Sequence, residues 1–292
     1  MRMNPTGPVR PLPQQAPLAY EGVEGRLERY APFAAASVAP RNVDVWLPPG
    51  YDTEPERRYP VIYAHDGQNL FVPELSFSGV DWGVDETLSR LVVEDEAEAA
   101  IVVGVWNTAA RIAEYMPERP MAEAHQPRLA ERFAEKYGQP PASDAYLRFL
   151  VHELKPFVDG AYRTRPDLPS TALMGSSMGG LISLYALCEH PAVFGAAACL
   201  STSWTVGGRV MVPYLRRAVP APGVHRVYFD YGVEAHIGRY EFYQRKVDFV
   251  FDQQGYTRGV DRQTRRFPGA EHSEAAWRAR LDVPLRFLLQ RR

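Results

Sequence analysis

The residues best suited to chemistry lie in the pentad Gly175-Ser-Ser-Met-Gly179, where Ser177 is the centre of a Gly-x-Ser-x-Gly pattern. The short apolar run 171–174 precedes it and predicts a buried strand, and the apolar spacing of 181–187 predicts a helix. A serine on a sharp turn between strand and helix has strained dihedrals and an exposed hydroxyl near the positive helix end. This context favours a nucleophile over a flexible turn, and favours Ser177 over its neighbour Ser176, which lies off the centre.

A serine hydroxyl needs an imidazole to accept its proton and a carboxylate to orient that imidazole. On a strand–turn–helix of this kind the chain order is serine, acid, histidine, so the base should follow Ser177. Of the four later histidines, His190 ends the predicted helix and points away, and His225 opens a strand at its wrong end. His236 is expected mainly to contact solvent. His272 follows the last predicted strand and is the expected base.

The acid should follow the preceding strand, 224–230, where two carboxylates occur. Glu234 comes after a glycine, in a loop that can bring it to the far nitrogen of His272, and we favour it for this reason. Asp230 is the last residue of the predicted strand and remains the alternative, although it can equally hold the turn.

Two backbone amides should stabilise the oxyanion. One is the amide of Met178, directly after the nucleophile. The other is expected from the loop that follows the strand 59–64, where Gln68 supplies the amide and Gly67 allows the turn. A metal is the rival explanation for His65-Asp66, but adjacent strand residues face opposite ways and no HExxH spacing occurs. We therefore expect no metal and no cofactor.

Four further residues follow predicted strands at their carboxyl ends, where substrates bind in open α/β sheets: Trp106, Asn107, Arg111 and Trp204. They are the candidate contacts for a small-molecule ester. Each tryptophan has the alternative of packing under a loop, and Arg111 has the alternative of pairing with Glu114.

Composition limits the class of protein. The chain has 292 residues, 46% of them hydrophobic, enough for one large α/β core. Its formal net charge of −2 gives no reason to expect a nucleic-acid or membrane partner. No apolar run approaches a membrane span and the N-terminus lacks a signal-peptide core, so a cytoplasmic location is expected. Cys188 and Cys199 should be small buried residues.

We expect a Pro-rich, disordered or extended tail at 1–20 and a single catalytic domain at 21–292, with a lid insertion at 117–143 as one interpretation of a long polar stretch. The sequence leaves open an assembly of identical copies. In the domain, strands alternate with helices, which predicts a mostly parallel sheet covered on both faces, a three-layer α/β/α sandwich. The expected strands are 41–48, 59–64, 99–105, 171–174, 194–200, 224–230 and 263–267; the expected helices are 82–91, 128–137 ended by Gly138, 145–159 capped by Asp144 and bent by Pro156, the helix after the pentad, 238–254 and one from 273.

Several segments in order resemble the putative esterase family, which includes esterase D, feruloyl esterases and enterochelin esterase-like α/β-hydrolases. They are Leu-Pro-Pro-Gly-Tyr-Asp at 47–52, Arg-Tyr-Pro-Val-Ile-Tyr-Ala-His-Asp-Gly-Gln-Asn-Leu-Phe at 58–71, Glu-Tyr-Met-Pro at 114–117, the pentad with its helix at 175–186, and Gly-Ala-Glu-His-Ser-Glu-Ala-Ala-Trp at 269–277.

The resemblance implies an α/β-hydrolase fold and a serine carboxylesterase with Ser177 as nucleophile and His272 as base. At 232–234 this chain has Gly-Val-Glu where relatives often carry Gly-Thr-Glu, so both acids stay open. Two alternatives also stay open: an acyltransferase or peptidase with the same triad, and a non-catalytic binding protein that keeps the fold.

Overall fold

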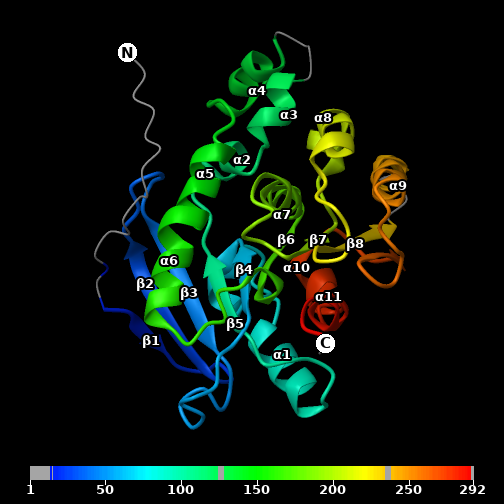
Figure 1. Ribbon diagram of the computed structural model, residues 1–292. Helices are drawn as coiled ribbons and strands as arrows, with labels where there is room; N and C mark the ends of the chain where they lie inside the picture. Colours follow the sequence, from blue (N-terminus) through cyan, green and yellow to red (C-terminus); the bar gives the residue numbers. More distant parts are fainter. Residues whose placement is uncertain (1–13, 15, 124–127, 234–237, 291–292) are drawn as a thin grey trace.

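The computed structural model describes residues 14, 16–123, 128–233 and 238–290, and within them nine strands pair into one sheet (Figure 1). The order across the sheet is β1-β2-β3-β5-β4-β6-β7-β8-β9. The strands are β1 Leu18–Tyr20, β2 Arg26–Phe33, β3 Arg41–Leu47, β4 Val61–His65, β5 Ile101–Val105, β6 Thr171–Ser176, β7 Ala196–Leu200, β8 Arg226–Val233 and β9 Arg262–Pro268.

The sheet has an antiparallel edge and a parallel centre. Strands β1, β2, β3 and β5 pair antiparallel, whereas β5, β4, β6, β7, β8 and β9 all pair parallel. The carboxyl ends of six strands therefore meet at one edge of the sheet. In parallel sheets this is the edge that carries ligand-binding loops.

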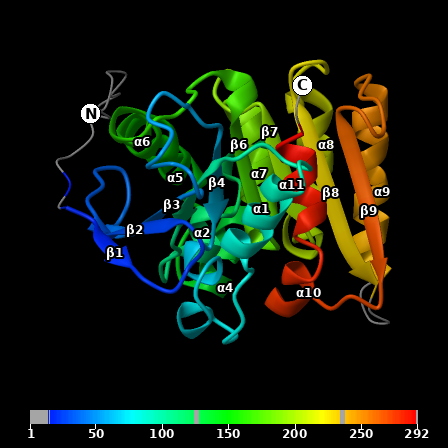
Figure 2. The same cartoon turned by 90° about the horizontal axis from the view of Figure 1, so that it is seen from below.

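Helices cover both faces of the sheet, which confirms the three-layer prediction. Helices α5 to α9 lie on one face and α1 and α11 on the other, in front of the sheet in Figure 2. The helical segments are η1 Gly67–Asn69, η2 Pro73–Leu75, α1 Val84–Val93, α2 Arg111–Glu114, α3 Glu118–Glu123, α4 Leu129–Tyr137, α5 Ser143–Phe149, η3 Leu150–Leu154, α6 Lys155–Ala161, η4 Leu168–Ser170, α7 Met178–Glu189, α8 Trp204–Ala218, α9 Gly238–Gln253, α10 Glu274–Arg278 and α11 Asp282–Leu288.

Alternation along the strands explains the two apolar layers. In β4, Val61 and Tyr63 join the core beneath α5 to α9, whereas Ile62 and Ala64 join the core beneath α1 and α11. Successive strand side chains point to opposite faces, so a strand covered on both faces is apolar throughout.

The strands expected from 41 onward all form, but the N-terminal part of the sheet was not predicted. Residues 18–20, assigned to the tail, form β1, and β2 pairs with β3 beside it. Residues 1–13 lie outside the described residues. Helix α8 was also missed, although it follows β7 directly.

The helix expected at 145–159 differs in two ways. Asp144 lies within the first turn of α5, and the cap position is Ala142, so the expected cap was wrong. The carboxylate of Asp144 instead accepts a hydrogen bond from the Tyr185 hydroxyl (2.8 Å). The helix also contains the π-helical stretch η3, which leads directly into α6, where Pro156 is the second residue.

The region 117–143 carries α3 and α4, the latter ending at Gly138 in the left-handed conformation as expected. Its role as a lid stays a prediction. Both cysteines are buried and free. Among the described helices, none combines the length and apolar character needed to cross a membrane.

Candidate active site

Ser177 stands at the sharp turn between β6 and α7. Its dihedral angles are φ 56° and ψ −118°, outside the regions that L residues favour. It is partly exposed, whereas Ser176 and Met178 on either side are buried. The strand, the turn and the helix thus present one serine hydroxyl at the carboxyl edge of the sheet, as the pentad predicts.

Neighbouring segments pack closely against both glycines of the pentad. A Cβ on Gly175 would lie 2.6 Å from the carbonyl carbon of Gly179, so no side chain fits. A Cβ on Gly179 would lie 3.3 Å from both Asp66 Oδ2 and the His65 Cβ. The loop after β4 therefore lies directly against the first turn of α7, beside the candidate nucleophile.

Backbone strain concentrates at this edge. Among the described residues, the four non-glycine residues with positive φ are Asp66, Asp95, Ser177 and Ser201. Asp66, Ser177 and Ser201 lie in the loops after β4, β6 and β7 respectively. Strained conformations of this kind cluster at functional sites.

The candidate oxyanion loop is the 3₁₀ turn η1. Asp66 caps it with φ 58° and ψ 46°, so the left-handed residue is Asp66 and not the adjacent glycine. Gly67 has a different constraint, since a Cβ there would lie 2.4 Å from the Gly104 carbonyl carbon in β5. Gln68 and Met178 both lie in first helical turns, where amides have no partner within their own helix. Their amides are thus positioned to donate outward.

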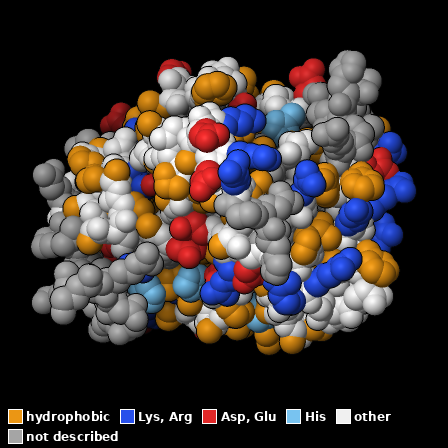
Figure 3. Space-filling view, turned by 90° about the horizontal axis from the view of Figure 1, so that it is seen from above, with side chains coloured by type: hydrophobic (Ala, Val, Ile, Leu, Met, Phe, Trp, Pro, Cys, Tyr) orange, Lys and Arg blue, Asp and Glu red, His pale blue; other side chains and the backbone are white. Residues whose placement is uncertain are grey.

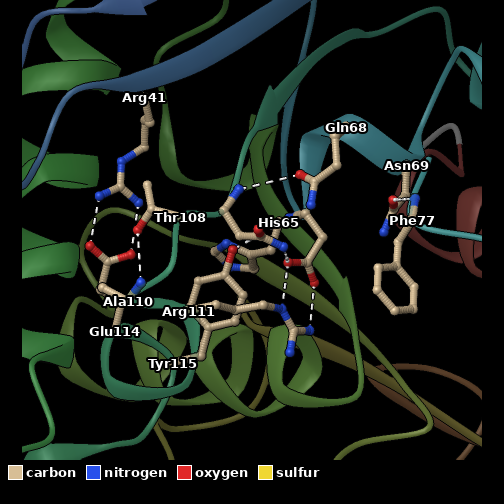
Figure 4. A network of polar contacts seen from close by, with 12 residues as sticks. Arg41, His65, Gln68, Asn69, Phe77, Thr108, Ala110, Arg111, Glu114 and Tyr115 are labelled. Carbon is tan, nitrogen blue, oxygen red and sulfur yellow. Dashed lines mark hydrogen bonds and ion pairs between the residues drawn. The ribbon is translucent and has the colours of Figure 1, made fainter. Parts of the chain in front are cut away.

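A partly buried ion pair fixes the start of this loop. The Arg111 guanidinium donates from Nε to Asp66 Oδ1 and from Nη2 to Oδ2, both at 2.7 Å (Figure 4). Asn107 adds a third hydrogen bond to Asp66 Oδ1 at 2.6 Å, and its backbone amide donates to the Gln68 side chain at 3.3 Å. Glu114 pairs with Arg41, so the alternative pairing with Arg111 was wrong. Asn107, which follows β5, and Arg111, at the start of α2, therefore hold this loop in place.

His65 lies beneath the loop and is fully buried. Its Nδ1 is 2.8 Å from the Tyr146 hydroxyl, and its Nε2 has no hydrogen-bond partner. Burial lowers the pKa of His65 to about 4, although the Asp66 carboxylate opposes the shift. The imidazole is therefore neutral at physiological pH. The described residues contain no cluster of three or more His, Cys, Asp or Glu side chains that could bind a metal ion.

His272 lies in the turn between β9 and α10, at the same edge of the sheet as Ser177. Its ring is exposed and contacts Trp277 (5.1 Å between centroids) and Tyr240 (5.7 Å). With Ser201 and Gly232 it lines a small hollow of about 10 Å³, the size of a single water position. Ser273 caps α10 by accepting a hydrogen bond from the Ala276 amide (3.4 Å).

The loop after β7 connects the two candidate catalytic residues. The Ser177 carbonyl accepts from the Ser203 amide (3.0 Å), and the Ser201 hydroxyl accepts from the Trp277 indole (3.2 Å). Because Trp277 in turn contacts His272, this loop positions both segments. The hydrogen bonds of the described residues include none between the Ser177 hydroxyl and His272. Catalytic hydrogen bonds are often long before substrate binds.

Asp230 has hydrogen-bond partners other than His272. Its buried carboxylate accepts from Arg280 Nε and Nη2 (both 3.1 Å), from the Ser201 amide (3.1 Å) and from the Tyr228 hydroxyl (3.3 Å). Burial raises its pKa, and Arg280 opposes that shift. Asp230 therefore supports α10 and the loop after β7. Glu234 and His236 lie outside the described residues.

The other histidines considered from the sequence lie away from this edge. His225 is buried, with its two ring nitrogens next to the carbonyl oxygens of Pro191 (2.7 Å) and Ala221 (3.3 Å). His190 follows the last residue of α7 and faces His152.

Two predicted substrate contacts are tryptophans that differ in placement. Trp204 is only 1% exposed and donates its indole N–H to Gln244, which agrees with the alternative of packing under a loop; a substrate contact stays a prediction. Trp106 is partly exposed, donates to Asp44 (2.8 Å) and lies beneath the Arg29 guanidinium.

Sequence reasoning named Ser177, His272, Gln68 and Met178 as candidates but missed Asp66 as the anchor of the candidate oxyanion loop. The available signal was its position directly after a buried strand, where it was considered only as a metal ligand. Its partner Arg111 lies 45 residues away in the chain, so the pair carries no local pattern.

Comparison with known proteins gives a family for this chain. A family model described as "Putative esterase" matches residues 35–288. The uncharacterized protein YbbA from Bacillus subtilis is 25% identical over 194 residues, covering 66% of this chain and 68% of that protein. The residues matched by the family model include the pentad and the turn that carries His272.

Solved structures show the same fold. A ferulic acid esterase aligns with a TM-score of 0.63 and 18% identity, covering 91% of this chain and 99% of that one. The enterobactin esterase FES from Shigella flexneri aligns with a TM-score of 0.66 and 18% identity, covering 94% of this chain and 60% of that one. The chain thus spans about three fifths of that enzyme. The fold is that of α/β-hydrolase-like esterases, and the chain belongs to the putative esterase family.

Proposed function

We propose that this protein is a serine carboxylesterase that acts through an acyl-enzyme. The observation that carries the proposal is the strained conformation of Ser177 at the turn between β6 and α7. Its family supports an ester hydrolase, and the names of its structural neighbours refer to ferulic acid and enterobactin esterases.

In the proposed reaction the Ser177 hydroxyl attacks the ester carbonyl while His272 accepts its proton. The new Ser177–carbon bond leaves a negative oxygen, towards which the Met178 and Gln68 amides donate. The bond to the alcohol then breaks, and His272 gives its proton to the departing oxygen. Water repeats the two steps on the acyl-enzyme, which releases the carboxylic acid and restores Ser177.

Glu234 is the proposed third member of the triad. It directly follows β8, and the rival Asp230 already binds Arg280, Ser201 and Tyr228. The proposal predicts that Glu234→Gln lowers kcat strongly in a stably folded protein. Asp230→Asn should mainly lower the melting temperature, because it removes one charge from a buried ion pair.

Labelling with a fluorophosphonate probe tests the nucleophile. The native protein and Ser176→Ala should be labelled, whereas Ser177→Ala should not be. Ser176→Ala is a matched control, since Ser176 is the buried neighbour in the same pentad. Labelling of Ser177→Ala, or none in the folded native protein, would contradict the assignment. A panel of aryl esters, with added alcohol or peptide as acceptor, then separates hydrolysis from acyl transfer and peptidase activity.

The pH dependence tests the base. We expect kcat/KM to rise with pH through about 6–7, as the imidazole of His272 loses its proton. The His272→Ala variant should lose most activity across the whole range. A flat profile for the native protein would argue against His272 as the base.

A further inference from the structure

Helices α8 and α9 border an open groove on the outside of the molecule. The groove has a volume of about 580 Å³ and lies along the outer sides of both helices. Gly208 allows the helices to approach, since a Cβ there would lie 2.7 Å from the Tyr243 ring. Phe242 and Phe249 also line the groove and are 52% and 58% exposed. Two large aromatic rings are thus in water beside a concave surface.

Cations surround this aromatic lining. Arg209 and Arg216 come from α8, and Arg245 and Lys246 from α9. Figure 3 shows Lys and Arg side chains next to hydrophobic ones on the side that carries α8 and α9. The ammonium of Lys246 lies 4.2 Å from the centre of the Phe242 ring. The chain as a whole carries a formal net charge of −2, so this concentration of positive charge is local.

Most of these cations lack a carboxylate partner. Arg245 pairs with Glu241, but Arg209, Arg216 and Lys246 take part in no ion pair within the described ranges. The other acids of α9, Asp248 and Asp252, pair with Arg262 on β9 and do not line the groove. The groove therefore has an excess of positive charge next to exposed apolar surface.

We propose that the α8/α9 groove binds a small amphiphilic anion, an alkyl or aryl body that carries one carboxylate. The apolar body would cover Phe242, Tyr243 and Phe249, and the carboxylate would meet the unpaired cations. The volume of the groove lies within the range typical of small-molecule sites, and its concave form favours such a ligand over an extended surface. The proposal does not depend on the chemistry of Ser177.

Calorimetric titration of the full chain with octanoate tests this site. We expect one octanoate to bind per chain, and the double variant Arg209→Glu/Lys246→Glu to weaken binding at least about tenfold. Phe249→Ala should also weaken it, since it removes apolar contact area. Octan-1-ol and inorganic phosphate should each bind at least about tenfold more weakly, because each supplies only half of the required chemistry.

Two control variants make the result specific. Lys136→Glu removes another exposed lysine above an aromatic ring, Tyr137 on α4, and should leave octanoate affinity unchanged. Ser177→Ala should bind octanoate as the native protein does, which separates the groove from the catalytic site. Unchanged affinity in a folded Arg209→Glu/Lys246→Glu protein, or equal affinity for octan-1-ol, would overturn the proposal.

Discussion

At the scale of single residues, the pair Asp66–Arg111 explains how the proposed oxyanion loop keeps its shape. The Asp66 side chain is only 4% exposed and its two oxygens accept both hydrogen bonds of the guanidinium. Asp66 is also the left-handed residue that starts η1, so its position determines where the Gln68 amide points. We therefore propose that Arg111 is a positioning residue, whereas the sequence suggested a substrate contact.

Replacing Arg111 should separate these two roles. We expect Arg111→Met to lower kcat by about tenfold to a hundredfold for neutral and acidic esters alike, because the misplaced loop weakens oxyanion binding. KM should change little. Arg111→Lys should recover part of kcat, since an ammonium keeps the charge but not the two-pronged geometry. Steady-state kinetics with a neutral and a carboxylated aryl ester give the measurement.

The control for Arg111 is a second bidentate pair at the opposite edge of the sheet. Arg165, which precedes β6, donates two hydrogen bonds of 2.8 Å to Glu98, which precedes β5. The Arg165→Met variant should leave kcat unchanged. A rise in KM confined to the acidic ester in Arg111→Met would instead assign Arg111 to substrate binding.

At the scale of elements, the turn between β6 and α7 depends on the absence of side chains. We expect Gly175→Ala to lower the free energy of unfolding by at least about 2 kcal/mol and to abolish activity, because the added Cβ meets the backbone of Gly179. Gly160 in α6 has nothing within 4 Å of its added Cβ. Gly160→Ala should therefore raise the free energy of unfolding by about 0.5–1 kcal/mol. Urea unfolding measures both, and equal effects would contradict the packing argument.

The central strands were predictable because burial on both faces makes them continuous apolar runs. The N-terminal strands were not, since the buried residues of β2, Leu27, Tyr30 and Phe33, lack the two-residue period of a strand, and Pro32 weakens a strand pattern further. Helix α8 was missed for a related reason. Gly207, Gly208 and Pro213 all lower its helix propensity, and packing against α9 stabilises it nevertheless.

At the scale of the whole molecule, the sequence predicted which loops meet but not how they are held. Chain order and parallel pairing bring the residues after β4, β6 and β9 to one edge, which could be predicted from the sequence. The catalytic roles of Gln68, Ser177 and His272 at that edge stay predictions. The pairs that fix these loops join distant positions. Arg280 lies 50 residues from Asp230, and Arg111 lies 45 residues from Asp66. Such pairs depend on the folded geometry and leave no local spacing to recognise.

Stability as a function of pH is a property of the whole molecule to which the buried His65 side chain should contribute strongly. The pKa of His65 is lowered to about 4 by burial, from its ordinary value of 6.5. Between these values the unfolded chain binds a proton that the folded chain does not. The contribution of His65 to the free energy of unfolding should therefore fall as pH decreases from 6.5 to 4, by about 3 kcal/mol, with no further loss from this group below pH 4.

Urea unfolding between pH 7.5 and 4.5 can isolate this effect through a difference between variants. Burial raises the pKa of Asp85 to about 6, so its own contribution stabilises the fold as pH falls below 6 and opposes that of His65. Because Asp85 is present in every variant, its effect cancels in the comparison. On acidification His65→Gln should lose less stability than the native protein, whereas His152→Gln, which removes an exposed imidazole, should respond as the native protein does. If His65→Gln loses as much stability on acidification as the native protein, another group controls the response.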